Sequence, residues 1–457
     1  MKIIQFGEGN FLRGFVDLYL DTLNKEGLGN FEVNIIKPIA RGSLEKFYNQ
    51  NNKYHVILRG RQNGVDLEEP YKVDCITNVY NPFTNNDKFY ELAVDPEVKI
   101  LISNTTEAGI VYDENDTFDK CPDITYPAKV TKWLYKRFKA GLGGLYLLPC
   151  ELIDHNAEEL YNCIDKYITL WGLEEEFRVW NNTQNIYCNT LVDRIVSGYP
   201  RDAETKEYLT KLIGEEDALM AVAEPYGLWV IEDKGDIKNI LKEGHHNIDV
   251  VFTKDISYYK ARKVRCLNGS HTHLVPLALM VGHTTVFDAM NDEVLKDFVL
   301  KTLEEEIIPF VSKTVPVEET TAFAMDVDER FFNPFLNHQL SAITLNSVGK
   351  WKARNLPSFQ DYYNKHGKIP HNMTIGLANL IALYLHLEEV EDKWICHLPN
   401  RDIEYKDELK FLEYFKNGNT VHDFLSDTSI WGIDLTKFDR LETTIEALLE
   451  DINELYE

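Results

Sequence analysis

The sequence predicts an α/β protein with an N-terminal domain built on a parallel sheet and a second, mostly α-helical C-terminal domain. In the first half, short apolar runs alternate with longer helical patterns, which is typical of a parallel sheet with crossover helices. From about residue 257 the chain changes to long helical patterns punctuated by prolines. A chain of 457 residues can bury two cores. We place the boundary near residue 250, which gives domains of residues 1–253 and 254–457.

Four apolar runs are the strand candidates of the parallel sheet: Lys2–Phe6, Val33–Ile36, Val98–Ser103 and Gly144–Leu148. A glycine turn and a helix from about Phe11 to Asn24 follow the first strand. Tyr54–Arg61 and Tyr71–Val79 flank Asn63-Gly64, a dipeptide that favours tight hairpin turns, so we expect an antiparallel insertion there. Trp229–Ile231 is the last strand candidate. In the second domain, Glu293–Val311 and Met373–Glu389 carry apolar residues at helical spacing.

Composition limits the classes of partner. A net charge of −26 argues against binding nucleic acid or an anionic membrane, because both call for a basic surface, but it permits a small acidic substrate in a locally basic pocket.

The seven cysteines are an odd number without a C-x-x-C pair, which indicates reduced thiols of a cytoplasmic protein. The chain enters a strand at once, which leaves no room for a signal peptide, and it has no apolar run of about 18 residues.

The first strand leads into a nucleotide-binding pattern. Gly7 permits a tight turn, and Gly9 lets the backbone approach a pyrophosphate at the start of the helix. Leu12 replaces the third glycine of the usual fingerprint. The residues expected around the cofactor in this segment are Phe6, Gly7, Gly9, Asn10, Phe11 and Arg13.

The ends of the next strands add further cofactor candidates. The second strand ends in Lys37 instead of an acid for the ribose hydroxyls, which favours NADP or another mode of ribose binding. Small polar residues follow the third strand, where open α/β sheets bind ligands, although they also suit a capped helix start. They are Asn104, Thr105, Thr106 and Glu107. Asn156 lies shortly after the fourth strand, so by the same logic we expect it to face this site.

Lys263, Asn268 and His271 form the candidate catalytic group. At offsets of 0, 5 and 8 they point to about 0°, 140° and 80° on an α-helix, which is one broad face. A lysine in apolar surroundings can act as a general base, an asparagine amide can hold an alkoxide oxygen, and a histidine can orient a hydroxyl. The same spacing also fits an ordinary helix start with polar residues facing water.

These motifs together resemble the long-chain polyol dehydrogenase family typified by mannitol dehydrogenase, whose catalytic helix carries Lys-x4-Asn-x2-His. The resemblance covers nearly the whole chain, including Val192-Asp193-Arg194-Ile195, Trp229-Val230-Ile231-Glu232-Asp233 and Arg330-Phe331-Phe332-Asn333-Pro334. The opening Phe6-Gly7-Glu8-Gly9-Asn10-Phe11-Leu12-Arg13-Gly14-Phe15, Asn104–Ile110 and Leu148-Pro149-Cys150-Glu151-Leu152 are similar to the branch that contains tagaturonate reductase (altronate oxidoreductase).

The resemblance implies a metal-independent enzyme that uses NAD on a Rossmann-type domain, with NADP left open by Lys37. It implies that Lys263 is the general acid/base, that Asn156 and Asn268 form the oxyanion site, that His271 binds substrate, and that Asp193 faces substrate. Polyol-oxidising members place a carboxylate three residues before the lysine, whereas this chain has Lys260. That cation, with Lys350 and Arg354, suits a sugar acid, although all three also fit surface positions at helix ends.

We therefore expect NAD-dependent interconversion of tagaturonate and altronate. The alternatives are a fructuronate/mannonate or mannitol/fructose-type oxidoreductase of the same family, and a dinucleotide-sensing protein without activity. We expect no metal, because His245-His246 and His271-x-His273 lack a carboxylate or cysteine at ligand spacing. The sequence does not indicate the oligomeric state.

Overall fold

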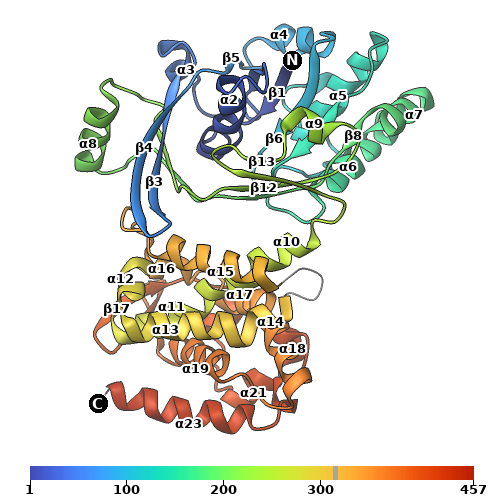
Figure 1. Cartoon of the computed structure of the whole chain (residues 1–457). Coiled ribbons are helices and arrows are strands. Elements are labelled where there is room, and N and C mark those ends of the chain that lie inside the picture. Colours follow the sequence, from blue (N-terminus) through green and yellow to red (C-terminus); the bar gives the residue numbers. More distant parts are fainter. Residues whose placement is uncertain (312–316, 457) are drawn as a thin grey trace. The chain divides into compact units, whose positions relative to one another are not determined.

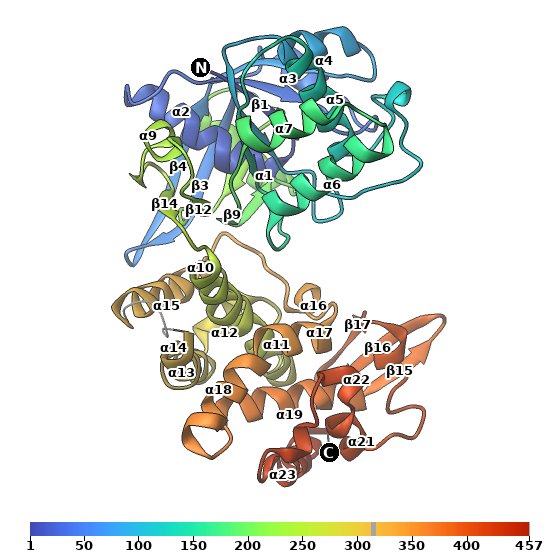
Figure 2. The same ribbon diagram turned by 90° about the vertical axis from the view of Figure 1, so that its right-hand side faces the viewer.

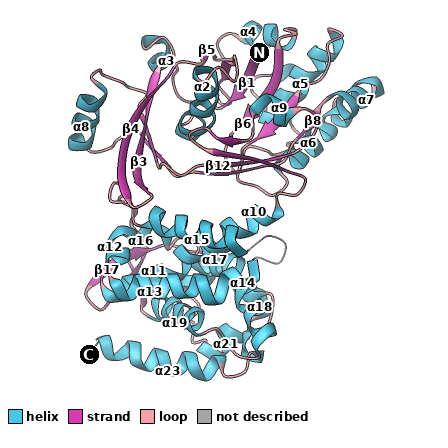
Figure 3. Ribbon diagram, in the orientation of Figure 1, coloured by secondary structure: helices cyan, strands magenta, loops and turns pink. Residues whose placement is uncertain are grey.

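The structure is a computed structural model that describes residues 1–311 and 317–456. It divides into two compact units, Met1–Ile256 and Ser257–Glu457, shown in Figure 1 and turned by 90° in Figure 2. The first unit mixes strands and helices, whereas the second is mostly helical (Figure 3). The predicted fold class is confirmed.

A six-stranded parallel sheet forms the centre of the first unit, in the order β5-β2-β1-β6-β7-β8. Phe6 pairs with both Ile36 and Ser103, so the carboxyl ends of three strands meet at one edge of the sheet. The strands are β1 (Lys2–Phe6), β2 (Glu32–Ile36), β5 (Ile76–Tyr80), β6 (Val98–Ser103), β7 (Tyr146–Pro149) and β8 (Ile186–Tyr187).

Both faces of this sheet are buried, which is why its strands are continuous apolar runs. In β1 the neighbours Ile3 and Ile4 belong to separate cores on opposite faces. The helical segment Asn10–Lys25 covers the Ile3 face; it consists of α1 (Asn10–Leu12), a π-helical turn, η1 (Arg13–Asp17), and α2 (Leu18–Lys25). The Ile4 face is covered by α4 (Asn86–Ala93), α5 (Tyr126–Lys139), α6 (Asn156–Leu170) and α7 (Glu175–Gln184), of which the last three lie together in Figure 2.

Two smaller sheets complete the first unit, in the orders β10-β11-β3-β4 and β13-β14-β12-β9. Their strands are β3 (Tyr54–Gln62), β4 (Val65–Val73), β9 (Thr190–Asp193), β10 (Val196–Gly198), β11 (Ala221–Ala223), β12 (Leu228–Glu232), β13 (Gly244–His245) and β14 (Asp249–Thr253). The remaining helices of the unit are α3 (Glu45–Asn49), a short 3₁₀ turn at Phe118–Lys120, α8 (Ala203–Ile213) and α9 (Ile237–Leu241).

The predicted hairpin turn at Asn63-Gly64 is confirmed, with φ angles of 52° and 76°. The second strand of the hairpin was predicted wrongly, because Tyr71–Val79 is split. The hairpin partner is β4, while β5 pairs in parallel with β2 in the main sheet. β4 is a largely exposed edge strand containing Pro70, so it carries no apolar alternation. A further strand, β14, comes after Trp229–Ile231 in the chain, so the strand candidate Trp229–Ile231 is not the last strand of the unit.

Two apolar helices form the centre of the second unit, α11 (Gly269–Val281) and α19 (His371–Leu385). Around them lie α10 (Ser257–Arg262), η3 (Lys263–Asn268), α12 (Val286–Asn291), α13 (Glu293–Lys301), η4 (Thr302–Ile307), α14 (Ile308–Val311), α15 (Val317–Phe331), α16 (Leu340–Ile343), α17 (Ser347–Arg354), α18 (Leu356–His366), α20 (Leu409–Leu412), α21 (Val421–Ser426), α22 (Thr428–Trp431), α23 (Leu441–Asn453) and 3₁₀ turns at Leu435–Lys437 and Glu454–Tyr456. The predicted helix Glu293–Val311 is thus continuous, with a π-helical turn inside it.

The predicted helix Met373–Glu389 ends at Leu385, and an antiparallel sheet follows. Its strands are β15 (Leu387–Val390), β16 (Lys393–Leu398) and β17 (Arg401–Tyr405). All seven cysteines are buried and free of disulfides, as predicted. Among the described residues, no helix has the length and hydropathy needed to cross a membrane.

Candidate active site

The turn after β1 requires glycine at one position and leaves space at the other. Gly7 has a φ of +124°, and a Cβ there would lie 2.8 Å from the Asn104 carbonyl oxygen. Gly9 precedes the helix without a side-chain cap, and a Cβ there would meet nothing within 4 Å. The first turn of the helix therefore faces open space with N–H groups that no side chain of Gly9 can cap, which fits the diphosphate of a dinucleotide.

A pocket of about 490 Å³ lies beside this turn. It is lined by Phe11, Asn104, Thr106, Glu107, Ala108 and Leu152. The structure thus brings Phe11 of the helix together with three of the predicted residues that follow β6. Thr106 adopts a φ of 75°, which bends the chain there. The pocket is at the edge of the sheet where the sequence predicted cofactor binding.

Glu151 organises the loop beneath the pocket, a role that the sequence analysis missed. Its buried carboxylate accepts from Ser103 Oγ at 3.0 Å, and from both Thr105 N and Thr105 Oγ1 at 2.9 Å. Burial raises the pKa of Glu151. Asn104 Nδ2 donates to the neighbouring Cys150 carbonyl at 2.7 Å. Thr105 is therefore a residue that fixes the loop, and the signal for this in the sequence was an acid two residues after β7.

Arg13 contacts the protein interior. Its side chain is buried, and its guanidinium lies over the ring of Tyr54 at 5.4 Å and donates to the Leu219 carbonyl. It also donates to Asn10 Oδ1 at 2.5 Å. Asn10 in turn packs on the backbone of Gly198, where a Cβ would lie 2.2 Å from Nδ2. Arg13 thus positions Asn10, and direct contact between Arg13 and a cofactor stays a prediction.

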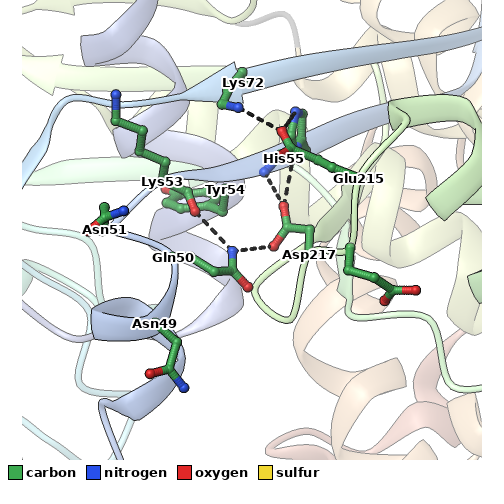
Figure 4. Close-up of a pocket in the computed structure, with 10 residues that line it drawn as sticks. Asn49, Gln50, Asn51, Lys53, Tyr54, His55, Lys72, Glu215 and Asp217 are labelled. Carbon is green, nitrogen blue, oxygen red and sulfur yellow. Dashed lines mark hydrogen bonds and ion pairs between the residues drawn. The ribbon is translucent and has the colours of Figure 1, made fainter.

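A second pocket in the first unit, of about 330 Å³, is shown in Figure 4. Its polar side chains bind one another: Lys72 Nζ lies 2.6 Å from Glu215 Oε1, and Asp217 accepts from Gln50 at 2.8 Å and lies 3.1 Å from His55 Nδ1. Asp217 Oδ1 also accepts from the amide of Leu219 at 2.8 Å, whose carbonyl binds Arg13. This pocket holds none of the predicted site residues, and its side chains fix the loop that anchors Arg13.

The predicted catalytic residue Asn156 is buried at the start of α6. Its Nδ2 contacts three carbonyl oxygens, those of Pro149 at 2.9 Å, Thr190 at 3.1 Å and Glu151 at 3.2 Å. Its Oδ1 accepts from Thr190 N at 3.0 Å. Because an amide has two hydrogens, these bonds occupy the donor capacity of the group. Asn156 ties β7 to β9 here, and its role as an oxyanion donor stays a prediction.

Asp193, predicted to face substrate, is a buried residue at the end of β9. Next to it, Arg194 donates to four backbone carbonyls, including that of Gly14 in the helix after the glycine turn at 3.1 Å. The motif Val192-Asp193-Arg194-Ile195 therefore holds a strand end against the helix that begins at the cofactor pocket.

In the second unit, Lys263 and Asn268 begin and end a π-helical turn, followed by α11 with His271. The Gly269 amide donates to the carbonyl of Val264, five residues back. The angles expected for a regular α-helix are therefore wrong over this stretch. Because a π-turn spans five residues, Lys263 and Asn268 are brought closer to the same side than the predicted 140°. π-turns inside helices are frequent at functional sites.

His271 lies in a cluster of basic side chains, which we call the His271 cluster: His271, Arg330, His338, Lys350 and Arg354. The His271 ring stacks on Phe331 at 3.9 Å and lies 5.2 Å from the ring of His338. Burial lowers the pKa of His271 well below its ordinary value, and the positive charges of Arg330, Arg354 and Lys350 lower it further. Burial also lowers the pKa of His338. His271 is therefore neutral near pH 7 while its surroundings are positive.

The two predicted substrate cations of this cluster are held by α17. Lys350 Nζ donates to the Ile343 carbonyl at 3.0 Å, and Arg354 Nη1 donates at 3.0 Å to Thr272 Oγ1, next to His271. Burial lowers the pKa of Lys350, with a further contribution from Arg354. Arg330 and His338 were not predicted as members, although Arg330 lies in the motif Arg330-Phe331-Phe332-Asn333-Pro334. Lys260 is half-buried on α10, in the turn before Lys263.

His273 occupies different surroundings from His271. Its ring stacks on Phe298 at 4.4 Å, and Nε2 lies 3.1 Å from Thr302 Oγ1. The His271-x-His273 pair therefore does not converge on one point. In the described part of the chain, no group of three or more histidine, cysteine and acidic side chains is placed to hold a metal ion.

In comparisons with known proteins, two family models match along the chain. The family model described as mannitol dehydrogenase Rossmann domain matches residues 1–242, and the mannitol dehydrogenase C-terminal domain model matches residues 255–453. Altronate oxidoreductase of Yersinia enterocolitica is 37% identical over 468 residues, covering 99% of this chain and 94% of that protein. The altronate oxidoreductase of Bacteroides thetaiotaomicron is 38% identical over 463 residues, with the same coverage.

Two solved structures share the fold. Mannitol 2-dehydrogenase of Pseudomonas fluorescens, in a ternary complex with NAD and D-mannitol, superposes with a TM-score of 0.70 at 20% identity, covering 100% of this chain and 92% of that chain. A substrate-free D-sorbitol dehydrogenase gives a TM-score of 0.79 at 20% identity, covering 99% and 93%.

Proposed function

The chain belongs to the mannitol dehydrogenase family, and we propose that it is an NAD-dependent reductase that interconverts tagaturonate and altronate. The observation that carries the choice of a sugar acid is the His271 cluster, since a neutral polyol has no group that needs several cations. The names of the altronate oxidoreductases, similar over nearly their whole length, support the same substrate.

The first unit fits a dinucleotide. The open space at Gly9, the tight turn at Gly7 and the pocket lined by Phe11 and Asn104 form a cradle at the carboxyl edge of a parallel sheet. When bound, NADH supplies the hydride that the reduction of a ketone requires. The NAD bound in the mannitol 2-dehydrogenase complex supports this choice of cofactor.

The second unit supplies the proton and the polar contacts. In the reduction, Lys263 donates a proton to the substrate oxygen as hydride reaches the adjoining carbon; in the oxidation, it removes that proton. The Asn268 amide donates to the same oxygen and stabilises its developing negative charge. His271 is neutral, so it binds a hydroxyl by a hydrogen bond without adding charge.

The cations Lys350 and Arg354 bind the carboxylate of the sugar acid in this proposal. A charge-assisted hydrogen bond from either residue is stronger than a hydrogen bond between neutral groups. Because both residues are half-buried, water and salt screen their charges less than they screen charges on the surface. Lys260 is a further candidate for the same carboxylate. The seven buried cysteines without disulfides support a cytoplasmic location for the enzyme.

The proposal is tested by following NADH oxidation at 340 nm with tagaturonate, fructuronate and fructose. We expect kcat/KM to be highest for tagaturonate, and lowest for fructose because it lacks a carboxylate. A higher value with fructuronate would change the substrate and keep the chemistry, and a higher value with fructose would overturn the acid-binding role. Binding of NADH without turnover of any of the three would favour a sensor.

A further inference from the structure

The end of β2 holds a buried cation where dinucleotide folds that use NAD usually place an acid. Lys37 follows β2 directly, and its side chain is only 1% exposed. Its Nζ lies 3.0 Å from Glu8 Oε1 and donates to the Arg41 carbonyl at 2.5 Å. Lys37 is therefore turned inward and its charge is balanced, so it is not presented to a ligand.

Glu8 brings a carboxylate to the same place from a different element. It is the residue between Gly7 and Gly9, in the turn that leads into the cofactor helix. Lys37 contacts its Oε1, and 24% of the Glu8 side chain stays exposed. The glycine turn and the end of β2 thus share one ion pair whose acidic member faces outward and whose basic member is buried.

The loop after β2 is fastened, which keeps Lys37 in this position. Lys129 of α5 donates to the Pro38 carbonyl at 2.8 Å and to the Ile124 carbonyl at 2.6 Å. Burial lowers the pKa of Lys129 to about 8, so it is mostly protonated at pH 7. Gly42 has a φ of +94°, and a Cβ there would lie 3.1 Å from Lys37 Nζ. The loop therefore closes tightly around the lysine.

We propose that Glu8, oriented by Lys37, replaces the missing acid of the second strand and determines the preference for NAD over NADP. Its carboxylate accepts hydrogen bonds from the adenosine ribose hydroxyls, as the acid of the usual fingerprint does. A 2′-phosphate would bring about two negative charges next to that carboxylate, while Lys37 is already neutralised by Glu8 and Lys129 is held by the Pro38 and Ile124 carbonyls. This inference rests on the proposed use of NAD and adds the residue that selects it.

The test measures binding, with no sugar present. NADH and NADPH are titrated into the protein, and the fluorescence of the bound dihydronicotinamide gives each Kd. We expect the wild-type protein to bind NADH more tightly. Glu8→Gln should weaken NADH binding about tenfold, the effect of losing a hydrogen bond to a charged group, and should tighten NADPH binding because Lys37 loses its counter-ion.

Two further variants separate charge from position. Glu8→Gln combined with Lys37→Met leaves no unpaired buried charge, and it should bring the two Kd values to within about threefold of each other. Glu45→Gln makes the same change of charge at an exposed position on α3, just after the loop, and should leave both Kd values unchanged. Thermal unfolding shows that each variant is folded.

If Glu8→Gln and the double variant both keep the wild-type ratio of the Kd for NADH to the Kd for NADPH, the assignment of Glu8 is overturned. Because the titration contains no uronate, this result leaves the proposed substrate untouched. Failure to reduce tagaturonate, with the Kd ratio responding to Glu8 as expected, would overturn the proposed substrate alone. Tighter binding of NADPH by the wild-type protein would overturn both the choice of NAD and the role of Glu8.

Discussion

At the scale of single residues, the proposed mechanism depends on Lys263 as the proton donor. Lys263→Ala should lower kcat by about two to four decades, the usual contribution of general acid–base catalysis. The Kd for NADH should stay within about twofold, because the proposed nucleotide cradle consists of residues of the first unit. Single-turnover kinetics and a fluorescence titration measure the two quantities. A variant that keeps most of its activity would remove Lys263 from the mechanism.

His273 gives a prediction for stability against pH. Burial lowers its pKa from 6.5 to about 3, so the unfolded chain binds the proton more tightly than the folded one. Its contribution to stability is complete above pH 6.5 and is lost as the pH falls from 6.5 toward 3. Lowering the pH from 7 to 5 should therefore reduce the free energy of unfolding by about 2 kcal/mol through this one group.

The matched control for His273 is His273→Leu, which removes the titrating group. Thr302 Oγ1 keeps its bond to the Phe298 carbonyl at 2.7 Å, so the variant leaves no unpaired hydroxyl. Between pH 7 and pH 5, the free energy of unfolding measured with urea should fall by about 2 kcal/mol less in the variant than in the wild-type protein. An identical fall in both proteins would show that His273 does not titrate in this way.

The ion pair of Glu8 and Lys37 and the buried partners of Arg13 show what the sequence could not reveal at this scale. Residue type and position predicted that Gly7 and Gly9 form a turn, because only backbone geometry is involved. Contact of Arg13 with the cofactor stays a prediction, and one of the partners that the structure shows is the Leu219 carbonyl, more than two hundred residues away in the chain. Contacts of that kind depend on tertiary packing, which no local pattern carries.

At the scale of elements, substitutions at the two glycines of the turn should have different effects, one on stability and the other on NADH binding. Gly7→Ala places a Cβ against the Asn104 carbonyl at a positive φ, so it should destabilise the first unit by about 1–3 kcal/mol. Gly9→Ala adds a methyl group to open space at a φ of −70°, so its Tm should be unchanged. Its Kd for NADH should nevertheless rise at least about tenfold, since the methyl group occupies the space proposed for the diphosphate.

Calorimetry and NADH titration of both glycine variants check this prediction. Equal losses of stability in the two proteins would contradict the different surroundings of the two glycines. Unchanged NADH binding in Gly9→Ala would place the diphosphate elsewhere.

The elements themselves were predictable where burial is uniform. The strands of the main sheet are buried on both faces, so they appear in the sequence as apolar runs such as Val98–Ser103. The strands β4, β15 and β17 are partly exposed and rich in charge, which hides them from a search for apolar runs. The π-helical turn at Lys263–Asn268 was also beyond prediction, because an apolar pattern does not distinguish it from a regular helix.

At the scale of the whole molecule, an acidic protein is proposed to bind an acidic substrate. A net charge of −26 repels a sugar acid at long range, whereas the His271 cluster attracts it at short range. The net charge permitted a small acidic substrate in a locally basic pocket, and Lys350 and Arg354 were named from the sequence. The cluster as a whole depends on α11, α15 and α17 meeting in the second unit.

The central claim is that this cluster selects a substrate with a carboxylate, and one measurement tests it most directly. The values of kcat/KM for tagaturonate and for the uncharged ketose fructose are compared in the wild-type protein, in Lys350→Met and in Lys352→Met. Lys352 is its neighbour on α17 and serves as the matched control. Lys350→Met should raise KM for tagaturonate about tenfold or more and change the values for fructose little, and Lys352→Met should behave as the wild type. Equal losses on both substrates in Lys350→Met, or a wild-type KM for tagaturonate, would contradict the account.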